Sequence, residues 1–209
     1  MERATDTVFI VDDDASFSRG LARLVQIAGW RARVFASADE FLAPGAVDPE
    51  APGCVLLDVR MPGIRGPDAH RAMLARGIDL PVIFLTGHGD VPTSVAAMKL
   101  GAADFLEKPV PGEVLMGAIR AALQRHANVR TERAHRREIE ARLARLTTRE
   151  REVLDHVVAG RLNKQIAADL DISLKTVKAH RGRVMEKMEA RSVAGLVDMC
   201  RSVEMRERG

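Results

Sequence analysis

The sequence predicts an α/β doubly wound five-stranded parallel sheet joined by a helical linker to an all-α four-helix domain. Two observations carry this prediction. From residue 7 to about residue 125, short apolar runs alternate with amphipathic helical patterns, as in βα units whose sheet is covered on both faces. From residue 146 onward the pattern is helical throughout, with cap and turn residues at short intervals. The expected boundaries are therefore 1–125, 126–145 and 146–209.

The elements of the first domain follow from its apolar runs and from the residues that begin and end its helices. Gly29 ends the first helical pattern, Ser37 begins a short second helix, and Gly101 closes a later one. Strands are expected at 8–11, 31–36, 54–57, 82–85 and 102–106. Helices are expected at 15–28, 67–75 and 91–100, with a last one that runs from 112 past 123.

The segment 126–145 is rich in Arg and Glu and lacks Gly and Pro, which predicts a solvated continuation of the last helix. A broken apolar stripe runs through this region, too gapped for a coiled coil. It consists of Ile119, Leu123, Ile139, Leu143 and Leu146. We therefore expect a semi-rigid helical linker.

Four helices are expected after the linker, each marked by a cap residue or a glycine. The marking residues are, in chain order, Thr147 or Thr148, Gly160, Asn163, Ser173 and Ser192. A tight turn at Asp171 and Ile172 separates the second helix, through 170, from the third, which runs to about 188. Two short helices joined by a tight turn form a helix-turn-helix.

Charge is divided unevenly along the chain. The net charge is +3, but residues 1–125 carry 13 Lys and Arg against 16 Asp and Glu, whereas residues 126–209 carry 19 against 13. The basic second part is the one expected to contact a polyanion. The two cysteines match neither a disulfide framework nor a metal spacing, and the sequence contains no membrane span or signal peptide pattern. We expect a cytoplasmic protein that does not contact the membrane.

Polar signatures follow four of the predicted strands. They are Val-Asp-Asp-Asp at 11–14, Leu-Asp at 57–58, Leu-Thr-Gly at 85–87 and Glu-Lys-Pro at 107–109. Because the carboxyl ends of parallel strands share one edge, these side chains are expected to meet there. Clustered carboxylates repel one another, so the cluster needs a divalent cation or a lysine partner, and Mg²⁺ is the natural divalent occupant.

Such a site is suited to phosphoryl transfer onto an aspartate. Attack by Asp58 on a phosphoryl donor places negative charge on the equatorial oxygens, which the metal, Lys108, Thr86 and backbone N–H groups can neutralise. The product is an aspartyl phosphate. Each of these residues alone has an ordinary structural explanation, but their joint order in one alternating domain favours the functional one.

Residues 7–125 resemble the receiver domain of two-component response regulators, a flavodoxin-like fold, and the whole chain is similar to the FixJ subfamily. The motifs that carry the resemblance are Val-Asp-Asp-Asp at 11–14, Leu-Asp-Val-Arg-Met-Pro-Gly at 57–63, Thr-Gly-His-Gly-Asp-Val-Pro at 86–92 and Asp-Phe-Leu-Glu-Lys-Pro at 104–109. The resemblance implies that Asp58 is the phosphoacceptor. It also implies a Mg²⁺ site made by Asp12, Asp13, Asp58 and the backbone carbonyl of Arg60.

The same resemblance assigns a switch to three residues. Thr86 and Lys108 would sense the phosphoryl group, and Phe105 would rotate inward as Thr86 moves, through packing alone because phenylalanine has no hydroxyl. The Lys108–Pro109 bond is expected to be cis. Asp14 is expected to cap the first helix rather than to bind metal.

The third helix of the second domain is predicted to enter the major groove of DNA. Val177, Val184 and Met188 fall on one face, which is expected to be core, while small and basic residues occupy the other faces. The segment also resembles the LuxR-type signature, at 147–154 and 176–180. Candidate phosphate contacts are Lys164, Lys175 and Thr176, and the candidates that face the bases are Lys178, Ala179, Gly182 and Arg183. Gly182 stands where some relatives carry a base-reading lysine, so no operator sequence is implied.

The sequence is therefore interpreted as a phosphorylation-activated transcriptional regulator. A sensor histidine kinase would phosphorylate Asp58, and a homodimer would then bind promoter DNA and activate transcription, with RNA polymerase as a partner by family analogy. The family's dimer face maps to Val95, Met98 and Lys99. No enzymatic turnover is expected beyond slow autodephosphorylation.

Two alternatives remain at this stage. One is a Mg²⁺-dependent phosphohydrolase that works through an aspartyl phosphate, against which no cap insertion or substrate-binding segment is visible. The other is a DNA-binding protein whose receiver is a constitutive dimerisation module. The joint presence of Asp12, Asp13, Asp58, Thr86 and Lys108 argues against this second alternative, because a purely structural role would not need them together.

Overall fold

The computed structural model describes residues 6–87, 98 and 100–204. The chain divides into two compact units, 1–129 and 130–209, and each unit has its own hydrophobic core. The functional boundaries expected at 125 and 145 stay a prediction. Among the described helices, none is both long enough and apolar enough to cross a bilayer.

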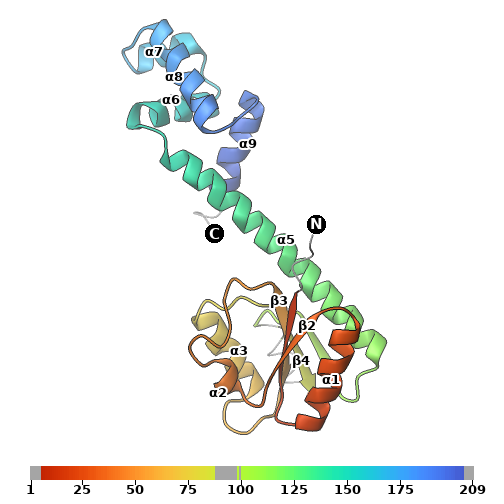
Figure 1. The fold of residues 1–209 in the computed structure, drawn as a ribbon. Coiled ribbons are helices and arrows are strands. Elements are labelled where there is room, and N and C mark those ends of the chain that lie inside the picture. The colour runs from red at the N-terminus through yellow and green to blue at the C-terminus, as the bar shows by residue number, and fades with distance from the viewer. Residues whose placement is uncertain (1–5, 88–97, 99, 205–209) are drawn as a thin grey trace. The chain divides into compact units, whose positions relative to one another are not determined.

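The first unit is built on a parallel sheet of five strands in the order β2-β1-β3-β4-β5 (Figure 1). The strands are β1 (Thr7–Val11), β2 (Arg31–Phe35), β3 (Gly53–Asp58), β4 (Val82–Thr86) and β5 (Asp104–Glu107). The predicted sheet is confirmed, with strand ends within two residues of those expected. The order reverses direction at β1, which has β2 on one side and β3 on the other. This reversal opens a crevice at the carboxyl ends of β1 and β3.

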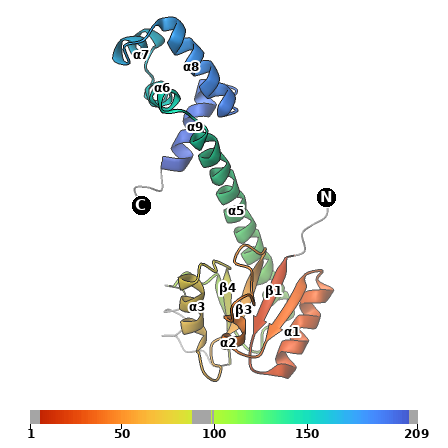
Figure 2. The same ribbon diagram turned by 60° about the vertical axis from the view of Figure 1, so that its left-hand side comes forward.

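Side chains alternate between the two sheet faces, so the strands contribute to two separate cores. Phe9, Leu57 and Phe84 pack on the face covered by α2 (Ala38–Phe41) and α3 (Gly66–Ala75). The residues between them, including Ile10 and Leu56, pack on the face covered by α1 (Ala15–Ile27) and the first turns of α5 (Gly112–Ala144). Figures 1 and 2 show α1 and α3 on opposite sides of the sheet. Both faces are therefore covered, as the continuous apolar runs predicted.

Side-chain caps fix where the helices of this unit begin. The Asp14 carboxylate accepts hydrogen bonds from the backbone N–H groups of Ser16 (2.8 Å) and Phe17 (3.0 Å), which confirms its expected capping role. These bonds hold the pKa of Asp14 below its ordinary value. Ser37 caps α2 through the N–H of Glu40. The helix expected at 91–100 lies outside the described residues, except for residues 98 and 100.

The second unit packs four helices on the last turns of α5. They are α6 (Thr148–Val158), α7 (Asn163–Asp169), α8 (Leu174–Lys187) and α9 (Val193–Glu204), and Figure 2 shows them grouped together. Val177, Val184 and Met188 are buried, as predicted for the core face of α8. Ile139 of α5 is also fully buried in this core. The broken apolar stripe of the linker thus supplies core residues to the second unit.

One predicted cap is wrong. Asn163 does not cap α7 but is its first residue, and Leu162 stands at the cap position. The side chain of Gln165 accepts a hydrogen bond from the Leu162 N–H at 2.8 Å, while the Asn163 side chain accepts one from Arg181 of α8. The Asn163 side chain, which the local sequence predicted to cap α7, is therefore used in a contact between α7 and α8. The other expected caps, Thr147, Ser173 and Ser192, are confirmed.

Candidate functional site

Two carboxylates and one ammonium group converge at the crevice between β1 and β3. Asp12 follows β1 directly, Asp58 ends β3, and Lys108 follows β5. The Lys108 Nζ lies 2.6 Å from Asp12 Oδ2 and 2.8 Å from Asp58 Oδ1. The carboxylates are almost fully buried, and the lysine side chain is 19% exposed. The lysine partner that clustered carboxylates require is therefore present, and it is shared between two acids.

Burial and pairing oppose each other in this cluster. Burial raises the pKa of Asp58, and the hydrogen bond and positive charge of Lys108 only partly offset it, while the Asp12 charge raises it further. Burial alone would lower the pKa of Lys108, but its hydrogen bonds to the two carboxylates raise it above the ordinary value. The charged form of Lys108 is thus stabilised, whereas at Asp58 burial destabilises the charged form by more than its partners stabilise it.

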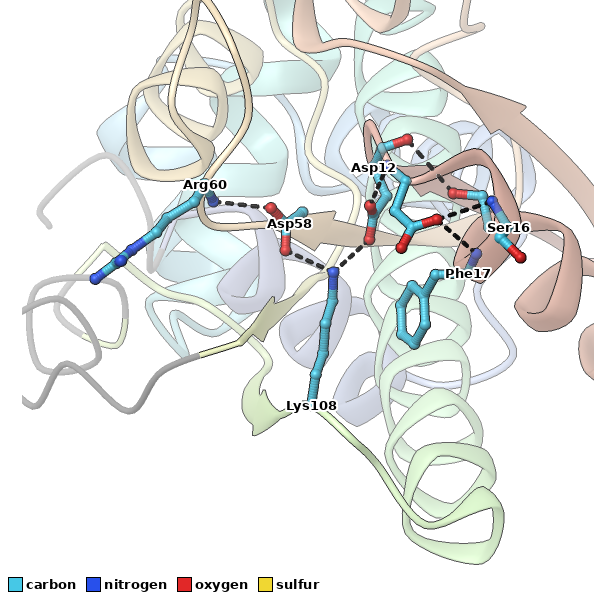
Figure 3. A network of polar contacts seen from close by, with 8 residues as sticks. Asp12, Ser16, Phe17, Asp58, Arg60 and Lys108 are labelled. Atoms are coloured by element: carbon cyan, nitrogen blue, oxygen red, sulfur yellow. Dashed lines mark hydrogen bonds and ion pairs between the residues drawn. The ribbon is translucent and has the colours of Figure 1, made fainter.

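Two further groups close around this cluster, as Figure 3 shows. Asp58 Oδ2 accepts the backbone N–H of Arg60 at 2.9 Å, so both oxygens of the carboxylate have a donor. The Lys108 ammonium lies over the ring of Phe17, 4.3 Å from the ring centroid. Phe17 comes from the first turn of α1, directly after the Asp14 cap.

The expected switch residues lie next to the cluster. Thr86 is buried at the end of β4, and its carbonyl accepts the backbone N–H of Lys108 at 2.6 Å. The Lys108–Pro109 bond is cis, as expected. Phe105 is half-buried on β5 with its ring centroid 6.3 Å from that of Phe84. The ring therefore packs against the sheet core.

The oxygen donors here suit a hard cation such as Mg²⁺, which keeps several waters and needs only one or two carboxylates. Asp13 is exposed beside the buried Asp12, and the Arg60 side chain is exposed beyond Asp58. Among the described residues, no three acidic, His or Cys side chains are arranged as a complete set of metal ligands. A cation here would therefore compete with Lys108 for carboxylate oxygens and would take other ligands from water and backbone.

The predicted DNA-contact residues lie on α7 and α8 of the second unit. Six of the seven are exposed, and Thr176 is half-buried at the start of α8, where its hydroxyl lies 2.8 Å from that of Ser173. The exposed six are Lys164, Lys175, Lys178, Ala179, Gly182 and Arg183. A Cβ at Gly182 would meet no atom within 4 Å, so this part of α8 is open to a close approach. The expected dimer residues Val95 and Lys99 lie outside the described residues, and Met98 is 51% exposed.

Comparison with known proteins finds a known domain family in each part of the chain. The model of the response regulator receiver domain matches residues 8–120, and that of the bacterial regulatory proteins of the luxR family matches residues 144–200. The chain is 46% identical to the transcriptional regulatory protein FixJ of Azorhizobium caulinodans, over 92% of this chain and 90% of that protein. The chain belongs to the FixJ-like response regulators. It is also 42% identical to the response regulator protein TodT of Pseudomonas putida F1, over 94% of this chain and 86% of that protein.

Solved response regulators share the fold over nearly the whole chain. The response regulator StyR has a TM-score of 0.87 at 41% identity, with 94% of this chain and 98% of that chain covered. Full-length FixJ from B. japonicum has a TM-score of 0.58 at 40% identity, with 96% and 98% covered. A receiver joined to a LuxR-type domain makes this response regulator a phosphorylation-dependent regulator of transcription. The comparisons do not favour a constitutive receiver module.

Sequence reasoning missed two contacts at these sites. Phe17 was not expected at the acidic cluster. It lies five residues after Asp12, in the first turn of a helix that begins at the sheet edge, and this position could have indicated that its side chain lies near the cluster. The pairing of Glu150 with Lys187, at 2.6 Å, was not expected either. Those residues are far apart in the chain, and no local pattern joins them.

Proposed function

We propose that Asp58 is the phosphoacceptor of this response regulator. The observation that carries the proposal is the position of its carboxylate, at the sheet edge and 2.8 Å from the Lys108 ammonium. An Asp58 oxygen forms the new O–P bond while the P–N bond of a kinase phosphohistidine breaks, and the departing imidazole nitrogen keeps the electron pair. Lys108 and the Arg60 N–H already donate to the carboxylate and are placed to neutralise charge on the phosphoryl oxygens.

We infer a Mg²⁺ site at Asp12, Asp13, Asp58 and the carbonyl of Arg60. Receiver domains generally bind Mg²⁺ at this acidic edge, and the donor chemistry of these residues fits it. When bound, the metal supplies positive charge to the transferring phosphoryl group. Asp12 and Asp58 also hold Lys108 charged, so the site keeps a cation of its own near the phosphoacceptor.

The proposed switch passes from the phosphoryl group to Thr86 and Phe105. The Thr86 carbonyl accepts the backbone N–H of Lys108, so the two residues that would sense the phosphoryl group are joined at the ends of neighbouring strands. Inward rotation of Phe105 would remodel the neighbouring face and promote a homodimer through Val95, Met98 and Lys99. Apart from accepting the phosphoryl group, the receiver is expected to catalyse only its slow loss by hydrolysis.

We propose that α8 reads promoter DNA in the cytoplasm, in a homodimer that also contacts RNA polymerase. Lys164, Lys175 and Thr176 are proposed to bind phosphates. Lys178, Ala179, Gly182 and Arg183 are proposed to face the bases, a role that their exposure on one helix supports. The working domains are proposed as 1–125 and 146–209, joined by 126–145.

The test compares the wild type with Asp58→Asn, with and without Mg²⁺ and beryllofluoride, which mimics a phosphoryl group. Sedimentation gives the mass, and fluorescence anisotropy gives the affinity for DNA. We expect dimerisation and tighter DNA binding in the wild type alone. If both proteins respond, or neither does, the assignment of Asp58 as the switch is wrong.

A further inference from the structure

The Lys108 ammonium is enclosed on three sides by groups that suit a cation. Two sides are the carboxylates of Asp12 and Asp58, and the third is the face of the Phe17 ring, with a distance of 4.3 Å from Nζ to the ring centroid. A cation within about 6 Å of a ring centroid is attracted by the negative face of the ring, more strongly when water is excluded. Figure 3 shows the Phe17 ring beside the end of the Lys108 side chain.

The Phe17 ring is held in this place from two directions. The backbone N–H of Phe17 donates to the Asp14 carboxylate at 3.0 Å, which fixes the first turn of α1. The half-buried side chain packs against the core beneath α1 and α5. The ring is therefore a preorganised surface and not a side chain that swings in solvent.

We propose that Phe17 is a positioning residue that holds Lys108 against Asp12 and Asp58, and so makes the lysine a stronger built-in competitor of a divalent cation. This inference rests on the proposed Mg²⁺ site. The ammonium occupies Asp12 Oδ2 and Asp58 Oδ1, so a metal that takes those oxygens has to displace it. The contact between the ammonium and the Phe17 ring exists only while the ammonium stays in this position. Its loss therefore adds to the free energy that the metal must supply to displace the lysine.

The proposal fixes the sign of a mutational effect. Phe17→Leu keeps an apolar side chain against the lysine stem but removes the aromatic face, so Mg²⁺ is expected to bind about fivefold more tightly, equivalent to ~1 kcal/mol. Phe17→Tyr keeps the ring and is expected to bind Mg²⁺ as the wild type does. If Phe17 were only a packing residue, its loss would loosen α1 beside Asp12 and weaken Mg²⁺ binding instead.

The experiment is a double-mutant cycle on the full chain, with Mg²⁺ affinity measured by titration calorimetry. The variants are Phe17→Leu, Lys108→Met and both together, with Phe17→Tyr as the conservative control. The tightening caused by Phe17→Leu is expected to vanish in the Lys108→Met background. Unchanged or weaker Mg²⁺ binding in Phe17→Leu, or an equal effect in both backgrounds, would overturn the proposal.

A second measurement needs no metal. The side-chain methylene protons of Lys108 next to Nζ lie over the Phe17 ring, so their NMR signals are expected upfield in the wild type and in Phe17→Tyr. Phe17→Leu is expected to remove this shift, and persistence of the shift would show that Phe17 does not hold the lysine. If the wild type binds no Mg²⁺, the proposed metal site and the competition both fail, and this signal alone decides whether Phe17 positions Lys108.

Discussion

Each unit of the chain buries a carboxylate beside a lysine, yet the pKa of the acid is raised in one unit and lowered in the other. In the receiver, burial raises the pKa of Asp58 despite its bond to Lys108. In the DNA-binding unit, the hydrogen bond from Lys187 and that from the Thr147 N–H lower the pKa of Glu150 to about 2. Burial is the largest cause of the shift at Asp58, whereas at Glu150, although only 2% exposed, hydrogen bonds outweigh it.

The two acids also differ in how completely hydrogen-bond donors replace water around the carboxylate. Glu150 Oε2 receives Lys187 at 2.6 Å and the Thr147 N–H at 2.9 Å, within a capping box that also satisfies its own backbone. Within the part of the chain that the structure describes, Lys187 pairs with no second acid, and it also donates to the Arg145 carbonyl at 3.1 Å. Asp58 shares its lysine with Asp12. An acid whose charge is fully stabilised by donors contributes to the stability of the fold. An acid whose charge is only partly stabilised can bind an additional cation or accept a phosphoryl group.

The largest loss of stability is expected from breaking the ion pair between Glu150 and Lys187. Lys187→Met leaves Glu150 buried without its ammonium partner, which should cost the second unit about 2 kcal/mol, less than for a fully buried pair because Lys187 is partly exposed. Faster hydrogen exchange in α6 and α8 would report it. Lys164→Met, at an exposed position of α7, is the control and should stay within ~0.5 kcal/mol of the wild type. A neutral result at Lys187 would show that the capping box alone accounts for Glu150.

The same substitution in the receiver should have a smaller and reversible effect. Lys108→Met leaves Asp12 and Asp58 facing each other, but the pKa of Asp58 is already raised, so this acid can take up a proton and the receiver should lose only about 1 kcal/mol. Because Mg²⁺ can take the place of the ammonium, millimolar Mg²⁺ should restore the thermal midpoint. Mg²⁺ should not rescue Lys187→Met. Equal rescue of both variants would remove the distinction drawn between the two sites.

The two units should also respond differently to acid. The Glu150 contribution to stability is complete above its unfolded pKa of about 4.5 and is lost as the pH falls toward about 2. The raised pKa of Asp58 has the opposite sign, because the folded receiver takes up that proton before the unfolded chain does. Hydrogen exchange between pH 6 and pH 3 should show the second unit weakening below pH 4.5. Glu150→Gln should flatten this pH dependence in the second unit only.

The smallest effect concerns the cap that helps to compensate Glu150. Thr147→Ala removes the hydroxyl that accepts the Glu150 N–H, at 3.3 Å, and should cost about 0.5–1 kcal/mol. Thr147→Ser keeps the acceptor and should restore most of the stability in urea unfolding. A loss as large as that of Lys187→Met would mean that the cap, and not the lysine, holds Glu150 in place.

Much of the fold followed from the sequence because it depends on local pattern. The apolar runs gave all five strands, and the caps at Asp14, Thr147 and Ser173 lie where their side chains suggested. The position of the acidic cluster also followed, because parallel strands must end at one edge. The roles of its residues stay proposals.

Contacts between distant elements were the part that local pattern missed. Asn163 has the right chemistry for a cap, but Arg181 binds its side chain across the helix-turn-helix. Ile139 was interpreted as part of a weak linker stripe, yet it is buried in the second core. The sequence around Phe17 is that of an ordinary apolar residue of α1. Its contact with the ammonium depends on Lys108, which is distant in the chain and lies over the ring only in the folded receiver.

The internal pairing of Lys187 also bears on how the protein responds to ionic strength. α8 carries five Lys and Arg residues, but Lys187 is engaged with Glu150 and Arg181 with Asn163. Only a cation that neutralises a DNA phosphate releases a condensed counterion. Among the cations of α8, only Lys175 is proposed to contact a phosphate, so the salt dependence of operator binding is expected to be shallower than the charge of α8 suggests.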